Sequence, residues 1–455
     1  MHKSESTGRY SLNAVKAGAL VLTLGLGACS SSPTTGTAGS PETGKPYSFW
    51  PQPPTEPHIQ FLRSFSGSED VSPTQTSTLE RLVLGSEKAA DIQAIQKPYG
   101  VAMKNGVIYV CDIRGNCVTA LDLKNKQTRL IGTSGLTNVA NPADVEVADD
   151  GTIYIADSQR GAVLVYDKQE RYRESFGHQG LKPVAVAVHG ERLYVCDMAA
   201  HDVEIWDRTT GKSIGVIGSM GDDDGQFRLP LGVATDSKGN VYVMDMMRCR
   251  CQKFDADGKF ISAKGQLGDQ AGTFARPKQM AVDSEGIQYI VDANFQNVQM
   301  YDDQDRMLME FGAAGKFAGS MDLPAGICVS DEGLEYFRDY IHPGFEAKRL
   351  ILVTNQFGPN KVSVYALGAR RESYPIAALS KNAATTTVEV NLTPERNRLQ
   401  SVGAEAPAEG DQAGDSSGDD SAPAAKPGAG KTQVQPGQTP PTSKPKTQGA
   451  GATRD

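Results

Sequence analysis

The side chains that could do catalytic chemistry are few in this sequence and stand far apart. The chain of 455 residues has six histidines, which are His2, His58, His178, His189, His201 and His342. No two of them are spaced as HxH or HxxxH, so the sequence lacks the histidine cluster that a zinc lyase requires. No GxSxG nucleophile elbow with a plausible partner occurs either. We therefore expect no enzymatic activity, no catalytic residue and no cofactor.

A sulfur-rich tract at 244–251, which reads MDMMRCRC, is a candidate for soft-metal or redox chemistry. Thiolate and thioether ligands suit Cu(I), so Cys249 and Cys251 are weak candidates for metal ligands. No CxxCH haem motif and no second CxxC accompany them. A core thiol at Cys251 and a loop thiol at Cys249 are the simpler interpretation, and we expect no metal.

The other cysteines give no clear disulfide framework. Cys111 and Cys196 occupy a repeat position that Ala156, Met244 and Val291 fill elsewhere, which predicts small buried hydrophobic residues. The sequence leaves open the disulfide state of Cys117, Cys249, Cys251 and Cys328.

Five aspartates recur after similar strands, and the series is Asp112, Asp157, Asp197, Asp245 and Asp292, with Thr354 in the sixth place. A ring of carboxylates suggests a cation site. Each aspartate, however, stands just before a turn, where its side chain can accept hydrogen bonds from free backbone N–H groups. Turn capping is the favoured interpretation.

These residues are positioned by an internal repeat that begins with a proline and contains a strand with tyrosine. Its copies are 97–122, 141–167, 182–207, 229–255, 276–302 and 323–333 continued by 351–366. The tyrosines from Tyr109 to Tyr289 recur at the spacing of propeller blades. Each copy has three short β-rich runs and then a fourth, which predicts four strands per blade. The sixth copy lacks its fourth strand, and the segment 59–67 has the composition to supply it and close the ring.

The repeat, P-x-G-V-A-V-D…G-x-I-Y-V-x-D…V-x-x-[FYW]-D, resembles the NHL repeat. Two copies are preceded by G-x-x-G-x-x-x-G-x-F, at 218–227 and 265–274. The resemblance covers roughly 59–368 and implies an all-β fold, a six-bladed β-propeller. It also implies kinship with lipoproteins of the Gram-negative envelope, some of which are encoded beside multihaem cytochromes.

A propeller would place one residue of each inner strand around its central channel, two positions after the opening proline. These residues are Gly100, Asp144, Ala185, Gly232, Gln279 and Gly326. Only Asp144 and Gln279 are polar, and they stand in opposite blades. They are the candidate channel ligands for the alternative function, a metal-dependent hydrolase or lactonase. A Ca²⁺ ion would need six or more oxygens there.

The turns between second and third strands depart from the polar NHL pattern. The candidate partner surface consists of Met246, Met247, Arg248, Phe295, Phe357 and Arg114. Exposed Met, Phe and Arg are enriched at protein interfaces. The alternative is that these tips fold inward over the channel. The aromatic insertion at 334–350 is expected at the opposite mouth.

The N-terminal residues form a predicted secretory signal. Basic residues precede the apolar run 17–28, which is shorter than the roughly 20 residues of a membrane-spanning helix. Leu26 to Cys29 resembles the lipobox of bacterial lipoproteins, which implies cleavage between Ala28 and Cys29 and lipid attachment at Cys29. Ser30 stands where an inner-membrane lipoprotein usually has Asp, so the resemblance implies the outer membrane.

We therefore divide the chain into a signal peptide (1–28), a Ser/Thr/Pro/Gly-rich tether (29–58), the propeller (59–368), a partly ordered extension (369–401) and a disordered low-complexity tail (402–455). The segment 73–92 is expected to form a short helix. The 46 basic and 54 acidic side chains give a net charge of −8, which argues against a nucleic-acid partner. The function we expect is a protein-binding scaffold, anchored to the outer membrane by lipid and facing the periplasm or the cell surface, in an envelope assembly that could include cytochromes.

Overall fold

The computed structural model describes residues 47–72, 93–133 and 138–380, all of which belong to one compact unit. The predictions for the signal peptide, Cys29, the segment 73–92 and the tail 402–455 lie outside these residues. No helix among the described residues has the length and apolarity needed to span a membrane.

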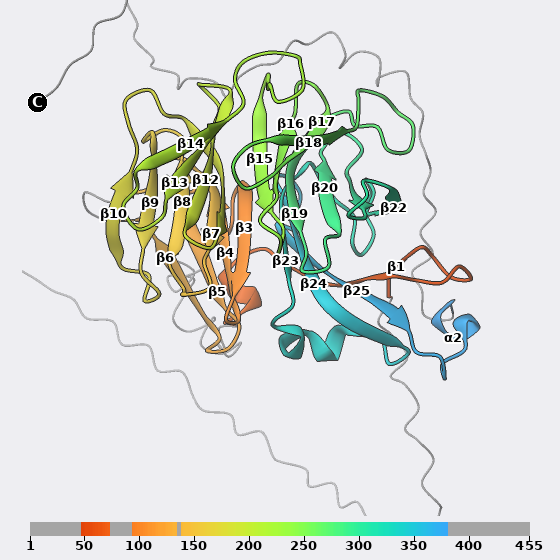
Figure 1. Cartoon of the computed structure of the whole chain (residues 1–455). Helices are drawn as coiled ribbons and strands as arrows, with labels where there is room; N and C mark the ends of the chain where they lie inside the picture. The colour runs from red at the N-terminus through yellow and green to blue at the C-terminus, as the bar shows by residue number, and fades with distance from the viewer. Residues whose placement is uncertain (1–46, 73–92, 134–137, 381–455) are drawn as a thin grey trace, which may run out of the picture. The chain divides into compact units, whose positions relative to one another are not determined.

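The described residues form six antiparallel sheets, which are the blades of a propeller (Figure 1). Blade 1 consists of β3 (Pro98–Lys104), β4 (Val107–Asp112), β5 (Cys117–Asp122) and β6 (Gln127–Ile131). Blade 2 consists of β7 (Pro142–Val147), β8 (Ile153–Asp157), β9 (Ala162–Tyr166) and β10 (Tyr172–Phe176). Blade 3 consists of β11 (Pro183–His189), β12 (Arg192–Asp197), β13 (Asp202–Asp207) and β14 (Ser213–Ile217).

Blades 4 and 5 repeat this order of four strands. Blade 4 consists of β15 (Pro230–Thr235), β16 (Val241–Asp245), β17 (Arg250–Phe254) and β18 (Phe260–Lys264). Blade 5 consists of β19 (Pro277–Val282), β20 (Gln288–Asp292), β21 (Asn297–Tyr301) and β22 (Met307–Phe311). The predicted all-β fold with four-stranded blades is confirmed.

Blade 6 is completed by the N-terminal strand, as the sequence predicts. It contains β23 (Pro324–Ser330), β24 (Phe345–Asn355) and β25 (Val362–Arg370), then β2 (Ile59–Phe65) and the short β1 (Phe49–Trp50). The pairing of β2 with β25 is antiparallel, with Ile59 opposite Leu367 and Phe65 opposite Val362. Neighbouring inner strands contact one another around the ring, and β23 contacts β3. The ring is therefore closed.

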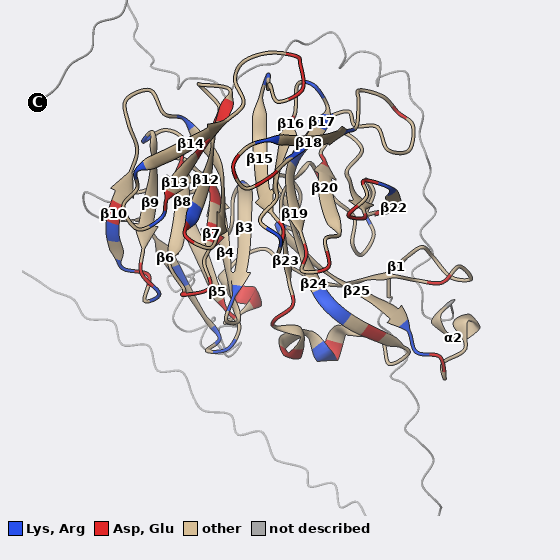
Figure 2. Ribbon diagram, in the orientation of Figure 1, with Lys and Arg blue, Asp and Glu red and all other residues tan. Residues whose placement is uncertain are grey.

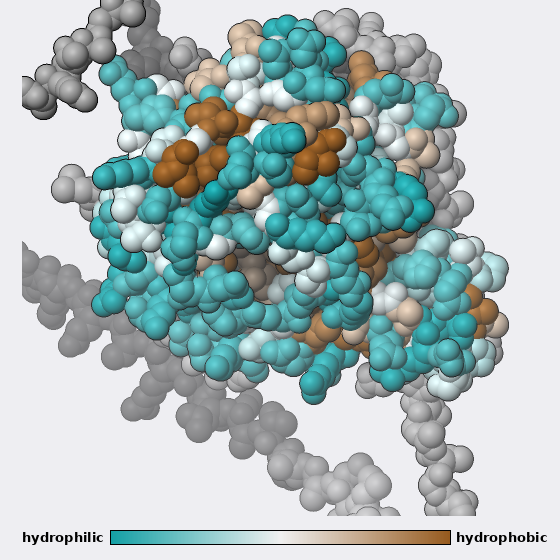
Figure 3. Space-filling model, in the orientation of Figure 1, coloured by the Kyte–Doolittle hydropathy of each residue, from teal (hydrophilic) through white to brown (hydrophobic). Residues whose placement is uncertain are grey.

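The core consists of apolar side chains packed between neighbouring blades. The recurring tyrosines Tyr154, Tyr194, Tyr242 and Tyr289 are at most 2% exposed. Figure 2 shows charged residues on the outer strand β10, whereas the inner strand β15 has none. Some outer strands still expose aliphatic side chains, such as Ile214 on β14 and Ile261 on β18. Figure 3 shows brown patches on the face of the molecule where Figure 1 draws β14 and β18.

The insertion of blade 6 lies at the end of the channel where the inner strands finish (Figure 1). It begins with the 3-10 helix η4 (Leu334–Tyr340) and continues into the lengthened β24. Phe337 and Phe345 are both 1% exposed within one hydrophobic cluster, and the ring of His342 lies 4.7 Å from that of Tyr47. Two short helices, η1 (Ser68–Asp70) and α2 (Ile376–Ser380), complete the described elements.

The aspartate at the end of each second strand joins two segments of backbone. In blade 2, Asp157 Oδ2 accepts the N–H of Ala140 at 2.6 Å, and Oδ1 accepts that of Asn141 at 3.1 Å. Its Oδ1 also accepts the N–H groups of Gln159 and Arg160 in the following turn. Asp157 thus ties the entry to the inner strand to the turn between the second and third strands, which is the capping role favoured by the sequence.

Blade 6 corrects the sixth place of this series. Pro324 pairs with Asn355, as Pro142 pairs with Asp157, so Asn355 and not Thr354 is the equivalent residue. Asn355 Oδ1 accepts the N–H of Asp322 at 3.1 Å. The alignment of the sixth repeat, which is interrupted by the insertion, was therefore wrong by one position at this residue.

Replacing Asp157 by alanine should destabilise the ring. The change leaves four backbone N–H groups near buried surface without their acceptor, and we expect a loss of at least about 2 kcal/mol in the free energy of unfolding. Urea denaturation followed by circular dichroism measures it. Asp303→Ala, at an exposed turn of blade 5, is the control and should change stability by less than about 0.5 kcal/mol. Equal stability of the two variants would contradict the tying role.

Candidate functional site

Every inner strand has a β-bulge after its first residue, which is a proline. In β7, for example, Pro142 pairs with Asp157 while Asp144 pairs with Ala156. A bulge bends its strand and redirects the side chains beside it, so these bulges shape the channel wall. We call this end of the channel the proline mouth, and it is marked by Pro98, Pro142, Pro183, Pro230, Pro277 and Pro324.

Three of the six positions predicted to ring the channel instead face a neighbouring strand. A Cβ on Gly326 would lie 2.0 Å from the carbonyl oxygen of Tyr99, and one on Gly100 would lie 2.5 Å from Cα of Asp144. A Cβ on Gly232 would meet the backbone of the next inner strand in the same way. These glycines let neighbouring blades approach, and they do not form a ligand site.

The channel encloses a cavity of about 150 Å³, which inner strands of all six blades line. Its lining includes five residues that are polar or carry a thiol, namely Asp144, Glu146, Thr235, Gln279 and Cys328. Both polar residues predicted from the sequence therefore face the same cavity.

Asp144 is held between blades. Its side chain lies over Gly100 of blade 1, and its Oδ2 accepts the backbone N–H of Val186 in blade 3 at 3.0 Å. Burial raises the pKa of this carboxyl to about 7, although hydrogen bonds from the N–H groups of Val186 and Val145 oppose the rise. The Asp144 carboxyl therefore gains and loses its proton near neutral pH.

Gln279, from the opposite side of the ring, is 4% exposed. Its amide is close enough to lower the pKa of Asp144, yet its Nε2 atom has no hydrogen bond of normal geometry to the described residues. The cavity could hold a few water molecules at about 30 Å³ each, and water is a suitable partner for this amide.

Glu146 and Cys328 were missed by the sequence analysis. Glu146 stands two residues after Asp144 on β7, and residues two apart on a strand share a face. Burial and the charge of Asp144 raise the pKa of Glu146 to about 8. Burial also raises the pKa of the Cys328 thiol. The alternation along β7 was the signal that could have identified Glu146.

Lys278, which follows the opening proline of blade 5, is a buried lysine beside Tyr99. Lys278 is 4% exposed, donates from Nζ to Gln356 Oε1 at 3.1 Å, and lies 5.4 Å from the ring centroid of Tyr99. Burial, together with the charge of the nearby Arg276, lowers the pKa of Lys278 to about 7. The position after the opening proline is apolar in most blades, so a lysine there was a detectable signal.

The predicted partner surface lies at the proline mouth, with unequal exposure of its members. Met247 is 55% exposed and Phe357 is 53% exposed. Arg114 and Arg248 are also exposed, whereas Met246 and Phe295 are half-buried. Met247 and Phe357 therefore point outward, as the partner-surface interpretation predicts. Met246 and Phe295 are partly covered, which is closer to the alternative that the tips fold inward.

Two further apolar side chains of this mouth were not predicted. Met220 and Leu267 occupy equivalent positions in the two glycine-rich motifs and are 59% and 72% exposed. Arg248 Nε lies 3.4 Å from Asp222, which places the Met220 loop beside the blade 4 tip. Cys249 Sγ lies 3.8 Å from the carbonyl oxygen of Ala275, so the Leu267 loop borders the same tip. We call Met220, Met247, Leu267 and Phe357 the apolar rim.

The sulfur tract is packed into blade 4. Cys251 is 2% exposed, pairs with Met244 across the strands, and has its Sγ 3.6 Å from Sδ of Met280. Cys249 is 4% exposed and its Sγ donates to the carbonyl oxygen of Met246 at 3.4 Å. Burial raises the pKa of each thiol to about 11, which disfavours the thiolate that a metal needs.

No family model and no curated protein matches this sequence. Solved structures resemble its fold. Virginiamycin B lyase from Staphylococcus aureus shares 10% identity with a TM-score of 0.43, over 60% of this chain and 96% of the lyase. Regucalcin from Agrobacterium tumefaciens shares 12% identity with a TM-score of 0.42, over 62% of this chain and 93% of its own. A protein of unknown function from Bacteroides thetaiotaomicron shares 18% identity with a TM-score of 0.46, over 68% of this chain and 75% of its own. The likeness is one of fold.

Stability should depend on pH through Asp144. Because its pKa is near 3.8 when unfolded and about 7 when folded, the unfolded state releases the proton first. The free energy of unfolding should therefore fall as the pH rises from about 4 to about 7. Asp144→Asn removes this term, so the variant should gain about 2 kcal/mol or more over the wild type between pH 4 and pH 8.

Urea denaturation at several pH values measures this difference. Asp303→Asn, which changes an exposed carboxyl in the same way, is the control and should follow the wild-type profile. A constant difference between Asp144→Asn and the wild type across this range would contradict the buried, protonated carboxyl.

Proposed function

We propose that this chain is a protein-binding scaffold whose apolar rim holds a partner within an envelope assembly. The observation that carries the proposal is the exposure of four large apolar side chains at one mouth, each more than half exposed. The loops of Met220 and Leu267 border the Met247 turn, and monomeric proteins seldom leave neighbouring apolar side chains exposed without a partner. Met and Phe are also enriched in protein interfaces. Arg248 follows Met247 in the blade 4 turn, and Arg114 stands in the corresponding turn of blade 1. Arginine is among the residue types enriched in binding hot spots.

The channel gives less support to the alternative function as a metal-dependent hydrolase or lactonase. Small-molecule sites are usually about 300–1,000 Å³ in volume, whereas this cavity is about 150 Å³.

The proposed setting follows from the chain's N-terminal sequence and its repeat. The lipobox-like residues up to Cys29 would place a lipid anchor in the outer membrane, and two or more acyl chains are enough for stable attachment. Residues from Tyr47 onward pack against blade 6, so the Ser/Thr/Pro/Gly-rich residues between Cys29 and Tyr47 would form the tether that lets an NHL-type propeller reach partners beyond the lipid surface.

Charge placed in the apolar rim should abolish binding of the partner. Met247→Glu and Phe357→Glu would each put a carboxylate into an apolar contact, and we expect at least about a tenfold loss of the co-purified partner. The measurement is affinity purification in mild detergent with quantitative mass spectrometry. Ile261→Glu, on the outer strand β18 and 48% exposed, is the matched control and should retain the partner. Unchanged recovery with both rim variants would contradict the proposal.

Removal of the thiol at residue 29 should release the protein from membranes. Cys29→Ser eliminates the acceptor for the lipid, so we expect the protein to move from the membrane pellet to the soluble fraction after an alkaline wash. Cys117→Ser, which keeps Cys29, should remain in the pellet. A Cys29→Ser protein that stays in the pellet would contradict lipid anchoring while leaving the scaffold proposal untouched.

A further inference from the structure

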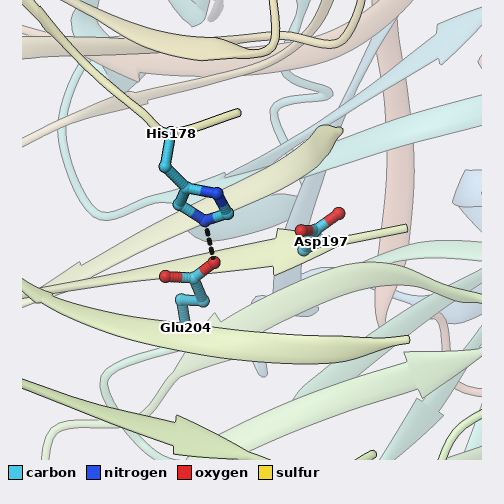
Figure 4. Close-up of side chains that lie close together, drawn as sticks. All are labelled: His178, Asp197 and Glu204. Atoms are coloured by element: carbon cyan, nitrogen blue, oxygen red, sulfur yellow. Dashed lines mark hydrogen bonds and ion pairs between the residues drawn. The ribbon is translucent and has the colours of Figure 1, made fainter. Parts of the chain in front are cut away.

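A histidine and two carboxylates meet on blade 3 near the proline mouth (Figure 4). His178 precedes β11, Asp197 ends β12, and Glu204 lies within β13. One ligand atom from each lies within 4.8 Å of the other two, and His178 Nε2 lies 2.6 Å from Glu204 Oε1. We call these three residues the blade 3 triad.

The Oδ2 atom of Asp197 lacks a hydrogen bond that the Oδ2 atoms of the equivalent aspartates accept. In four blades the Oδ2 of the equivalent aspartate accepts a backbone N–H, from Gln96, Ala140, Arg228 and Ala275. In blade 3 the corresponding N–H, that of Leu181, is directed to the carbonyl oxygen of His178. Oδ1 of Asp197 still accepts two backbone N–H groups, but Oδ2 accepts no hydrogen bond from the described residues. Asp197 as a whole residue is 1% exposed, and its Oδ2 atom, which is not fully buried, has an open side on which it can bind a ligand.

The outer contacts of the blade 3 triad orient its ligand atoms. His178 Nδ1 lies 3.2 Å from the carbonyl oxygen of Gln179, an acceptor that keeps a proton on Nδ1. Nε2 donates to Glu204 in this structure, and a metal ion that bound there would take the place of that proton, which is released to solvent. Trp206 Nε1 donates to Glu204 Oε2 at 2.8 Å and fixes that carboxylate. In metal sites a ligating histidine typically donates its other ring N–H to a backbone carbonyl, and a ligating carboxylate typically accepts hydrogen bonds from nearby donors.

Negative charge at the blade 3 triad is not balanced by a basic side chain other than that of His178. Among the described residues, no lysine or arginine forms an ion pair with Asp197 or Glu204. Asp202 pairs directly opposite Asp197 across β12 and β13, and its Oδ1 is buried without a hydrogen-bond partner in the described part of the chain. A cation would compensate these carboxylates. The side chain of His178 is 51% exposed, which leaves a path from solvent.

We propose that the blade 3 triad binds one divalent transition-metal ion of the Zn²⁺ class, through His178 Nε2 and one oxygen each of Asp197 and Glu204. Imidazole nitrogen and carboxylate oxygen are ligands that Zn²⁺ accepts, and a set of three protein ligands leaves a fourth position for water. Ca²⁺ prefers six to eight oxygens, so a site with a nitrogen ligand and few oxygens should discriminate against it. Binding replaces the hydrogen bond between His178 and Glu204, and it does not depend on the proposed scaffold function.

Equilibrium dialysis of the full mature chain, after chelator treatment, tests the proposal with Zn²⁺ and with Ca²⁺ as separate probes. We expect one Zn²⁺ per chain and no Ca²⁺. His178→Ala and Glu204→Gln should each weaken Zn²⁺ binding at least tenfold. Because Trp206 donates to Glu204, Zn²⁺ should also change the tryptophan fluorescence, and Trp206→Phe should remove that signal while the bound Zn²⁺ stays near one per chain.

Two matched controls separate this site from others. His189→Ala removes a histidine of the same blade that lies outside the triad, and the double variant Cys249→Ser, Cys251→Ser removes the sulfur tract; both should bind Zn²⁺ like the wild type. Thermal melts by circular dichroism establish that each variant is folded. Absence of Zn²⁺ from the wild type, unchanged affinity in folded His178→Ala and Glu204→Gln, or loss of binding in the cysteine variant would each overturn the proposal.

Discussion

The geometry of the proline mouth depends on the hydrogen bonds of one aspartate in each of blades 1 to 5 and of Asn355 in blade 6. Asp157 and its equivalents accept backbone N–H groups from two segments at once, the entry to the inner strand and the turn between the second and third strands. Both segments lie at the proline mouth. The same carboxylate that holds the blade together therefore fixes the tips that the apolar rim uses. A turn without this acceptor would leave N–H groups unsatisfied at the edge of the core.

Close packing of the inner strands explains the small and partly closed channel. Glycine at positions such as Gly100 and Gly326 lets neighbouring backbones approach to distances that a side chain would prevent. The channel is consequently narrow, and few polar side chains reach it. Asp144 is buried and Glu146 half-buried there, with pKa values raised to about 7 and about 8. Lys278, on the same strand as Gln279, is buried with its pKa lowered to about 7. The exposed residues of the proline mouth are therefore a better candidate for a binding site than the channel.

Repetition made the fold predictable, including the closure of blade 6 by the strand at 59–65. It also identified Asp144 and Gln279, since a polar residue at a glycine position stands out. Departures within a repeat were harder to interpret. Asn355 was displaced in the alignment by the insertion in blade 6, and Lys278 was overlooked at a position that is usually apolar. The blade 3 triad could not be found from spacing, because His178, Asp197 and Glu204 meet only through the pairing of β12 with β13 and the path of the preceding loop.

The most direct test of the scaffold account is site-specific photo-cross-linking in living cells. A photoreactive amino acid would be placed at Met247 and Phe357 of the rim, and at Ile261 and Leu308 on outer strands of similar exposure. The account predicts that a discrete envelope protein is cross-linked from the two rim positions and not from the two outer strands. Cross-links from the outer strands alone, or none from the rim, would contradict it.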